Sequence, residues 1–284
     1  MTILVTGTSG DLGRLIVEAL LRDGADPSSI AAGARNVYSL AELGARGVNV
    51  AKVDYTDSAS LDAALSGVET VVLVSSSEIG QRFAQHSAVI DAARAAGVAR
   101  VIYTSAPGAT TSQLILAPEH KATEEYLHAS GLTYTILRNN WYNENYLSTL
   151  QQAAATGAVV TSTGEGRVAS ASRADFADAA AVVALTSGHE NATYELSGDV
   201  AWTGAELADA VGEALGREIT YQSLTTDEHL AMLTAAGLDE GTAGFLVALD
   251  ANIARGDLAQ QSGELTRLIG RATTPLVDTF RAAL

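Results

Sequence analysis

Three glycines at regular spacing lie near the start of the chain, in the segment TGTSGDLGR at 6–14. An apolar segment at 3–6 precedes it, and a run with helical periodicity at 12–23 follows it. Glycine permits a tight turn there and lets backbone N–H groups approach a pyrophosphate at the helix N-terminus. An ordinary glycine-rich turn has the same composition, but the order strand, turn, helix favours a dinucleotide site. We expect cofactor contacts from Gly7, Thr8, Ser9, Gly10, Asp11, Leu12 and Gly13.

The end of the second predicted strand indicates which dinucleotide binds. The segment GARN at 33–36 places Arg35 and Asn36 where NAD-binding proteins usually carry an acidic residue for the ribose hydroxyls. A guanidinium there suits a 2′-phosphate, because its planar fork donates two hydrogen bonds to phosphate oxygens. The segment therefore predicts NADP(H) as the cofactor, with a solvent-facing arginine at a strand end as the alternative.

Polar side chains follow three further predicted strands, at the sheet edge where parallel α/β folds bind ligands. Plain loops or helix caps would account for the same residue types. We expect Asp54 and Tyr55 to contact the adenine. Further cofactor contacts are expected from the segments VSSSE and YTSA, at Ser75, Ser76, Ser77, Tyr103, Thr104 and Ser105.

The segment RNNWYNENY at 138–146 concentrates amide and aromatic side chains just beyond the sixth predicted strand. Amides there can hold a carboxamide or carbonyl oxygen, and an aromatic ring can wall a slot for a flat molecule. Packing at a seam between two parts of the chain is the alternative. Arg173, at the start of a later predicted helix, could reach a phosphate or this segment, or form an ion pair between the two parts. We expect ligand contacts from Asn140, Trp141, Tyr142, Asn143, Glu144 and Asn145.

Short β-rich segments that alternate with longer Ala- and Leu-rich periodic segments must position these residues. The alternation predicts an α/β fold, a doubly wound parallel sheet of Rossmann type with helices on both faces. The predicted strands are 3–6, 30–34, 48–53, 70–74, 100–105 and 133–138. The predicted helices between them are 12–23, 38–46, 58–65, 80–96 and 118–130. Gly97 and Gly131 suit the C-caps of the last two.

After residue 150 this alternation weakens. Helices are predicted at 173–187, 203–215, 226–236, 239–254 and 275–283, and short strands at 158–160, 193–196 and 219–222. We expect an NADP-binding domain at 1–150, and at 151–284 a continuation of the core plus a smaller, mostly helical lobe on the substrate side. The boundary is soft, because no linker or low-complexity segment marks it.

The composition excludes several classes of partner. A formal charge of −16 repels nucleic acid and anionic membrane surfaces. There is no cysteine, which rules out disulfides and thiolate chemistry, and no apolar run approaches the length of a membrane span. The five histidines lie at 86, 120, 128, 189 and 229, without metal-site spacing. We therefore expect a soluble cytoplasmic protein without a metal.

The glycine segment resembles the short-chain dehydrogenase/reductase superfamily, but the chain lacks the usual catalytic pair of that superfamily. No Tyr stands four residues before Lys52 or Lys121, the only lysines, so Tyr-x-x-x-Lys is absent. Six segments instead resemble, in order and spacing, the atypical NmrA-like branch: GTSGDLG, GARN, VSSSEIGQR, EHKATEEYL, GLTYTILRNNWYNENY and SASRADFADAA. Within this branch the chain is similar, over nearly its full length, to flavin-free bacterial NADPH:quinone oxidoreductases and to triphenylmethane dye reductases.

This resemblance implies an oxidoreductase that passes a hydride from NADPH directly to a quinone, without flavin or metal. The reduced oxygens of a quinone are weakly basic, so the transfer needs no strong general acid. The protein must then supply geometry and a water-poor slot. The alternatives are a reductase of another flat electrophile, such as a triphenylmethane dye, and an NADP(H)-sensing regulator without turnover. Only the regulator would need a protein partner.

The resemblance also bears on individual residues. It implies that 138–146 belong to the cofactor-binding region, and it places His120 where many relatives carry lysine while the quinone and dye reductases carry histidine. A lone histidine is more often structural, and His86 is equally ambiguous. The expected catalytic residues are His120, Asn140 and Tyr142.

Overall fold

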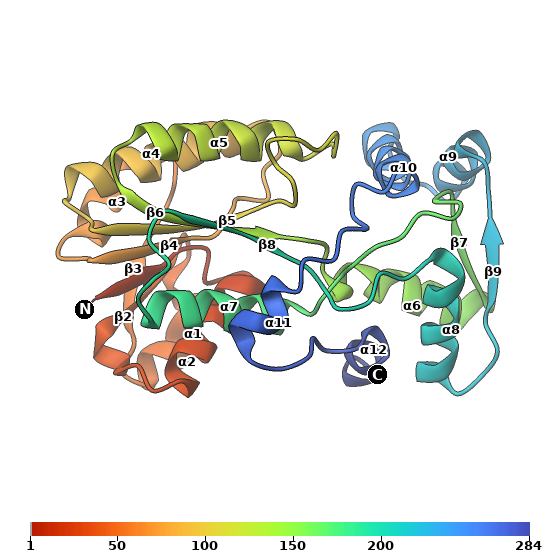
Figure 1. The fold of residues 1–284 in the computed structure, drawn as a ribbon, viewed down its shortest axis with the longest axis horizontal. Helices are drawn as coiled ribbons and strands as arrows, with labels where there is room; N and C mark the ends of the chain where they lie inside the picture. The colour runs from red at the N-terminus through yellow and green to blue at the C-terminus, as the bar shows by residue number, and fades with distance from the viewer. Residues whose placement is uncertain (1) are drawn as a thin grey trace.

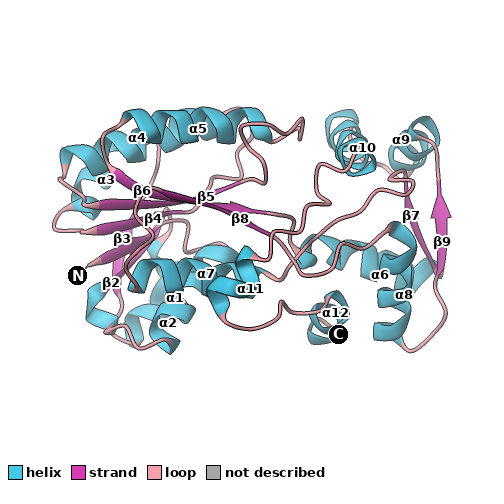
Figure 2. Cartoon of the chain, viewed as in Figure 1, coloured by secondary structure: helices cyan, strands magenta, loops and turns pink. Residues whose placement is uncertain are grey.

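A parallel sheet of seven strands forms the centre of the structure, a computed structural model that describes residues 2–284 (Figures 1 and 2). Each neighbouring pair of strands is parallel. Buried on both faces, such strands are almost continuously apolar, as in the segments ILV and TVVL. In spatial order the strands are β3 (Asn49–Lys52), β2 (Ile30–Ala34), β1 (Ile3–Val5), β4 (Thr70–Leu73), β5 (Arg100–Ser105), β6 (Thr133–Asn139) and β8 (Ala192–Leu196).

Helices cover both faces of this sheet (Figure 1). One face carries α3 (Ser58–Leu65), α4 (Arg82–Ala95) and α5 (Ala117–Ala129). The opposite face carries α1 (Asp11–Arg22), α2 (Ala41–Ala45), α7 (Arg173–Leu185) and α11 (Glu264–Ile269), with short 3-10 turns η1 (Pro27–Ser29) and η2 (Val37–Leu40) nearby. The predicted doubly wound α/β fold is confirmed.

A smaller, mostly helical part lies beyond the carboxyl edge of the sheet, at the right of Figure 1. Its two-stranded parallel sheet pairs β7 (Ala158–Thr161) with β9 (Thr220–Ser223). Around it lie η3 (Asn143–Tyr146), α6 (Leu147–Thr156), α8 (Gly204–Leu215), α9 (Thr226–Ala235), α10 (Glu240–Ala254) and α12 (Leu276–Ala282). Within residues 2–284 no helix is both long and apolar enough to cross a membrane.

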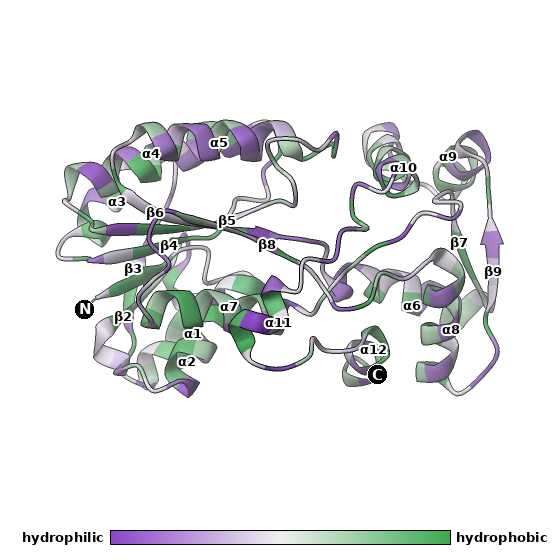
Figure 3. Cartoon of the chain, in the orientation of Figure 1, coloured by the Kyte–Doolittle hydropathy of each residue, from purple (hydrophilic) through white to green (hydrophobic). Residues whose placement is uncertain are grey.

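Burial explains why α7 belongs to the main sheet although it follows residue 150. Most of its ADFADAAAVVA stretch is buried, and Figure 3 colours α7 largely hydrophobic. A helix that is apolar on nearly every side needs cover on every side, and its alanines let it pack closely against α1 and α11. Because α7 and β8 join the main sheet, residues 151–284 contribute to both parts of the molecule. A domain boundary near 150 stays a prediction.

The strand order places the glycine segment at the point where the chain reverses direction across the sheet. Here β1 lies between β2 and β4, so the loops after β1 and β4 leave toward opposite faces. In such sheets the crevice between these loops binds ligands. The fold therefore gathers the carboxyl ends of β1 to β6 around one crevice.

Candidate cofactor and substrate cleft

A cleft of about 750 Å³ opens at the carboxyl edge of the seven-stranded sheet. Segments far apart in the sequence meet there, because the carboxyl ends of parallel strands share one edge. Most of the predicted site residues line the cleft: Gly7, Ser9, Gly10, Asp11, Leu12, Gly13, Arg35, Asp54, Tyr55, Ser75, Ser76, Ser77, Ser105, His120, Asn140, Trp141, Tyr142, Asn145 and Arg173.

The glycine loop has the geometry that a pyrophosphate requires. Gly7 has a φ of +62°, which favours glycine, and Gly10 N donates to Gly7 O at 3.0 Å. A Cβ on Gly13 would lie 2.5 Å from Gly7 O, so only glycine lets α1 approach the loop this closely. No side chain caps the N-terminus of α1. Its first N–H groups therefore remain available to a phosphate.

Arg35 lies at the end of β2 with its guanidinium held by a carboxylate. Its side chain is 72% exposed, and Nη1 lies 2.9 Å from Glu78 Oε1. Glu78 Oε2 in turn accepts a hydrogen bond from Gln85 Nε2 at 2.7 Å. The Glu78 carboxylate thus pairs with one nitrogen of the guanidinium that was predicted to bind a 2′-phosphate. Arg14, by contrast, is held outside the cleft lining by Glu42.

Asp54 and Tyr55 follow β3 and line the same end of the cleft. The backbone N–H and the hydroxyl of Thr56 donate to Asp54 Oδ1, and these bonds lower the pKa of the carboxyl group. Burial raises the pKa of Tyr55, whose hydroxyl lies 3.0 Å from Val74 O. The hydroxyl thus anchors to the strand, which leaves the tyrosine ring as the surface available to a flat base.

His86 supports the serine loop after β4 from behind. Ser76 N donates to His86 Nε2 at 2.9 Å, so the ring proton sits on Nδ1 and faces Thr123 Oγ1 at 3.1 Å. Burial and the charge of Arg82 lower the pKa of His86 to about 3. Thr104 Oγ1 accepts a hydrogen bond from Ser75 N at 2.9 Å. His86 and Thr104 therefore hold the loop backbone in place without lining the cleft.

His120 lines the opposite wall and forms a neutral pair with Tyr103. His120 Nδ1 lies 2.7 Å from the Tyr103 hydroxyl. Burial first, then the charges of Arg82 and His86, lower the pKa of His120 to about 3. Burial also raises the pKa of Tyr103. At neutral pH the pair consequently offers hydrogen bonds but no ionised acid or base.

Two neighbouring asparagines at the end of β6 differ in what their amides do. Asn140 Nδ2 donates to Leu258 O at 3.2 Å, and its Oδ1 accepts from Trp141 N at 2.7 Å. Asn139 Oδ1 is buried without a hydrogen-bond partner among residues 2–284. Both line the cleft, and the protein engages each end of the Asn140 amide once, so the expected catalytic role of Asn140 stays a prediction. Asn139, which the sequence reasoning passed over, is the amide with unused bonding capacity.

Tyr142 and Arg173 form the wall that faces the glycine loop. The Arg173 guanidinium lies 4.9 Å from the centre of the Tyr142 ring, and its Nη2 donates to Asn145 Oδ1 at 2.9 Å. Its Nη1 lies 3.9 Å from Asp11 Oδ2, across the cleft at the start of α1. This cation is close to the N-terminus of α1, where a pyrophosphate would bind. Trp141 packs instead against the apolar core of the smaller part.

Four further predicted contact residues lie outside the cleft lining, because the fold has already engaged their side chains. Thr8 Oγ1 donates to Val5 O, and Asn36 caps η2 by accepting from Tyr38 N. Glu144 accepts from the backbone N–H of Arg173 at 2.9 Å.

The fourth residue, Asn143, accepts from Ser170 and donates to Thr279. Together with Tyr103 and Thr104, these residues shape the cleft from behind.

The sequence reasoning missed several lining residues, of which Arg82, Gln85 and Asn139 are the most informative. Three buried side-chain atoms in residues 2–284 lack a hydrogen-bond partner: Arg82 Nη1, Gln85 Oε1 and Asn139 Oδ1. All three side chains line the cleft, which is where a ligand would satisfy them. The sequence held one signal that could have found two of them. Residues 82, 85 and 86 are polar and share one face of a predicted helix, which indicates a polar cluster there. The other missed residues are Ala34, Val53, Thr56, Val74, Glu78, Ala106, Pro107, Leu114 and Leu116.

Known proteins resemble this chain over almost its whole length. Residues 7–187 match a family of NAD(P)H-binding proteins. The chain is 44% identical over 277 residues to quinone oxidoreductase 2 of Escherichia coli, covering 98% of this chain and 96% of that protein.

Solved structures agree with these sequence matches. The crystal structure of the E. coli NADPH-dependent quinone oxidoreductase complexed with NADPH matches with a TM-score of 0.95 over 99% of both chains, at 44% identity. The Citrobacter sp. triphenylmethane reductase complexed with NADP(H) matches with a TM-score of 0.94 over 100% of both chains, at 35% identity. Given this similarity and the glycine loop at the reversal point of the sheet, the chain belongs to the NAD(P)H-binding family, within the NmrA-like branch of the atypical short-chain dehydrogenase/reductases.

Proposed function

We propose that this protein is an NADPH-dependent reductase that delivers a hydride directly to a quinone, without flavin or metal. The neutral Tyr103–His120 pair carries this proposal, because His120 lines the dinucleotide cleft, Tyr103 bonds it from behind, and neither offers an ionised acid or base. The 44% identity to an E. coli quinone oxidoreductase supports it. A cytoplasmic location and the absence of nucleic-acid partners stay predictions.

The residues of the cleft fit the cofactor. The glycine loop and the open N-terminus of α1 suit the pyrophosphate, and Arg173 adds a cation beside them. Arg35 suits the 2′-phosphate, which would replace the Glu78 carboxylate in its fork. Bound NADPH supplies the hydride. Asn139 has the unused amide oxygen that a carboxamide N–H group can donate to.

The uncharged Tyr103–His120 pair favours a quinone over an ordinary carbonyl compound. Reduction of a simple ketone leaves a strongly basic alkoxide that needs an acid at hand. With a pKa of about 3, His120 is uncharged at neutral pH, and Tyr103 keeps its proton. A reduced quinone is a weakly basic phenolate, which a neutral hydrogen-bond donor or water can protonate.

A triphenylmethane dye is a second candidate acceptor. The Citrobacter reductase that matches at a TM-score of 0.94 is a triphenylmethane reductase. Such a dye is a flat carbocation that takes a hydride at carbon, so it needs no proton at all.

The decisive experiment follows NADPH absorbance with purified protein and 1,4-benzoquinone, with NADH in parallel. We expect colourless protein, hydroquinone as the product, and at least a tenfold preference for NADPH, about 1.4 kcal/mol. Arg35→Ala should remove most of this preference. Arg46→Ala, which alters an exposed arginine paired with Glu18, should leave it intact.

Two results would contradict the proposal. NADPH binding without turnover of any quinone or dye would favour the regulator instead. Stoichiometric flavin that co-purifies and is reduced during turnover would exclude direct transfer.

A further inference from the structure

The guanidinium of Arg82 is buried in the wall of the cleft, and its Nη1 lacks a hydrogen-bond partner among residues 2–284. The residue is 5% exposed and lies in the first turn of α4. Its Nε donates to Ser76 O at 2.7 Å, the one side-chain hydrogen bond that Arg82 makes within residues 2–284. Buried donors are almost always satisfied in folded proteins, so unpaired donors in a ligand cleft indicate a group that arrives with the ligand.

The carboxylate of Glu119 forms a long ion pair with only one nitrogen of this guanidinium. Glu119 Oε2 lies 3.5 Å from Arg82 Nη1, and both oxygens of Glu119 already accept from Gly80 N at 3.2 and 3.1 Å. Glu78 is bonded to Arg35 and Gln85 instead. Arg82 therefore lacks the bidentate carboxylate partner that usually accompanies a buried arginine.

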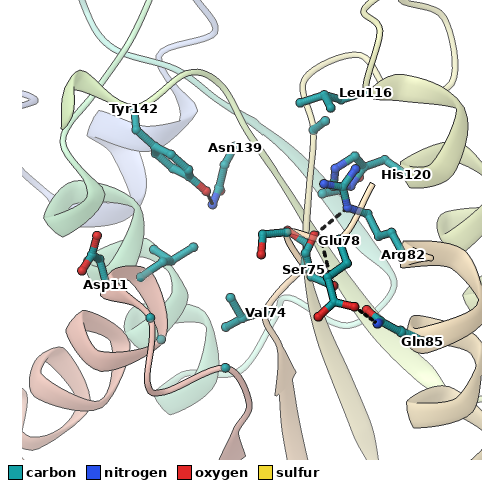
Figure 4. A pocket seen from close by; sticks show the side chains of 18 of the residues that line it. Asp11, Val74, Ser75, Glu78, Arg82, Gln85, Leu116, His120, Asn139 and Tyr142 are labelled. Carbon is teal, nitrogen blue, oxygen red and sulfur yellow. Dashed lines mark hydrogen bonds between the residues drawn. The ribbon is translucent and has the colours of Figure 1, made fainter. Parts of the chain in front are cut away.

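Arg82 lies on the acceptor side of the cleft. In Figure 4, Asp11 at the start of α1 and Arg82 occupy opposite walls, with Val74 and Ser75 between them. A pyrophosphate at the glycine loop would lie on the Asp11 side. Arg82 instead adjoins His120, whose pKa its charge helps to lower.

The surroundings of Arg82 define the chemistry of a ligand. Leu114 and Leu116 line the cleft with His120, and Leu116 lies above the His120 ring in Figure 4. Apolar side chains beside a cation with an unsatisfied donor suit a flat aromatic body that carries an anionic oxygen. A purely apolar acceptor would leave the Arg82 donors unpaired.

We propose that Arg82 binds the acceptor oxygen on which negative charge appears during reduction, and that the site favours aromatic acceptors bearing an anionic group. This inference rests on the proposed function. A quinone that accepts a hydride gains two electrons and one hydrogen, which forms an O–H bond at one oxygen. The ring becomes aromatic, and one negative charge remains on the second oxygen until it takes a proton from water. A preorganised guanidinium at this second oxygen stabilises the charge as it develops.

Binding of redox-inert probes tests the inference without turnover. Naphthalene-2-sulfonate and the neutral naphthalene-2-sulfonamide have the same ring system and differ in charge. By calorimetry on protein saturated with NADP⁺, we expect the sulfonate to bind at least tenfold more tightly. Arg82→Gln should abolish this difference, whereas Arg94→Gln, on the exposed last turn of the same helix, should preserve it.

Kinetics supply a second readout. Arg82→Gln should lower kcat/KM about a hundredfold for a naphthoquinone sulfonate, and about tenfold, mainly in kcat, for neutral naphthoquinone. Affinity for NADPH should stay within twofold. Arg82→Lys keeps the charge without the fork, so it should retain part of the sulfonate preference. It also serves as the test variant if Arg82→Gln melts at a much lower temperature.

The outcomes separate the two proposals. A sulfonate preference that survives in Arg82→Gln overturns the inference, and so does a loss of NADPH affinity as large as the loss of probe affinity, which would assign Arg82 to the cofactor. Failure of the proposed function would appear differently, as absence of quinone turnover in the unmutated protein whatever the probes show.

Discussion

At the end of β6, the two adjacent amides permit a matched test of function against packing. Asn139→Ala should lower quinone turnover at least tenfold, because it removes the unpaired amide oxygen from the cleft, while stability changes little. Asn140→Ala should instead lower stability by about 1–3 kcal/mol, because it removes the hydrogen bond to Leu258 O and leaves Trp141 N without its acceptor. Steady-state kinetics and urea unfolding of both variants would measure the two effects. Full activity in Asn139→Ala would refute the assignment.

The stability of the protein should depend on pH through His86. Burial and Arg82 lower its pKa from 6.5 to about 3, so below pH 6.5 the unfolded chain binds a proton that the folded chain excludes. The free energy of unfolding should therefore fall as the pH drops from 6.5 toward 3. His120 contributes in the same window.

In urea unfolding measured from pH 8 to pH 4, His86→Gln should flatten the dependence of the free energy of unfolding on pH. The slope should fall by up to about 1.4 kcal/mol per pH unit, which corresponds to one proton. Above pH 7 both proteins bind no proton at this site, and the two profiles should run parallel. Identical slopes below pH 6 would show that His86 is charged in the folded state.

Among the elements, the turn between β1 and α1 tolerates the least change. Gly13→Ala would place a Cβ 2.5 Å from Gly7 O, so α1 must shift away from the loop. We expect a loss of about 1–3 kcal/mol in stability and at least a tenfold loss of NADPH affinity, measured by thermal unfolding and fluorescence titration.

Gly244 provides the matched control, because a Cβ at this position in α10 would meet no heavy atom within 4 Å. Gly244→Ala should raise stability by about 0.5–1 kcal/mol through helix propensity alone. If Gly13→Ala behaves in the same way, the close approach of α1 to the loop is unimportant.

For the whole molecule, Asn143 links segments that are distant in the sequence. Its Nδ2 donates to Thr279 Oγ1 at 3.0 Å in α12, and its Oδ1 accepts from Ser170 Oγ at 2.6 Å. Asn143→Ala should cost about 1–3 kcal/mol of stability, since buried partners lose their hydrogen bonds, while kcat changes less than threefold. Asn49→Ala, on the exposed strand β3, should cost no more than about 0.5 kcal/mol. A tenfold fall in kcat with unchanged stability would contradict this structural role and show that Asn143 acts in the reaction.

The sequence alone determined the first six strands and five helices of the main sheet and the position of the cofactor loop. Alternation of apolar strands with periodic helices predicted β1 to β6 and α1 to α5 within a few residues, because hydrophobic period and glycine turns are local properties. Local signals also placed the glycine loop and Arg35 at the cleft. The helices α6 and α11 escaped prediction.

Only the tertiary structure decided how the second half of the chain is distributed and which polar groups face the cleft. The strand β8 joins the main sheet through its pairing with β6, a contact between segments more than fifty residues apart that no local pattern records. In the same way, Asn139 and Asn140 are identical in type, yet distant Leu258 engages only the second. In the sequence Arg82 resembles any other helical arginine, and only the packing of α5 and the serine loop around it makes it buried. Whether a polar side chain is used by the protein or left for a ligand depends on long-range packing, which the residue and its neighbours in sequence do not encode.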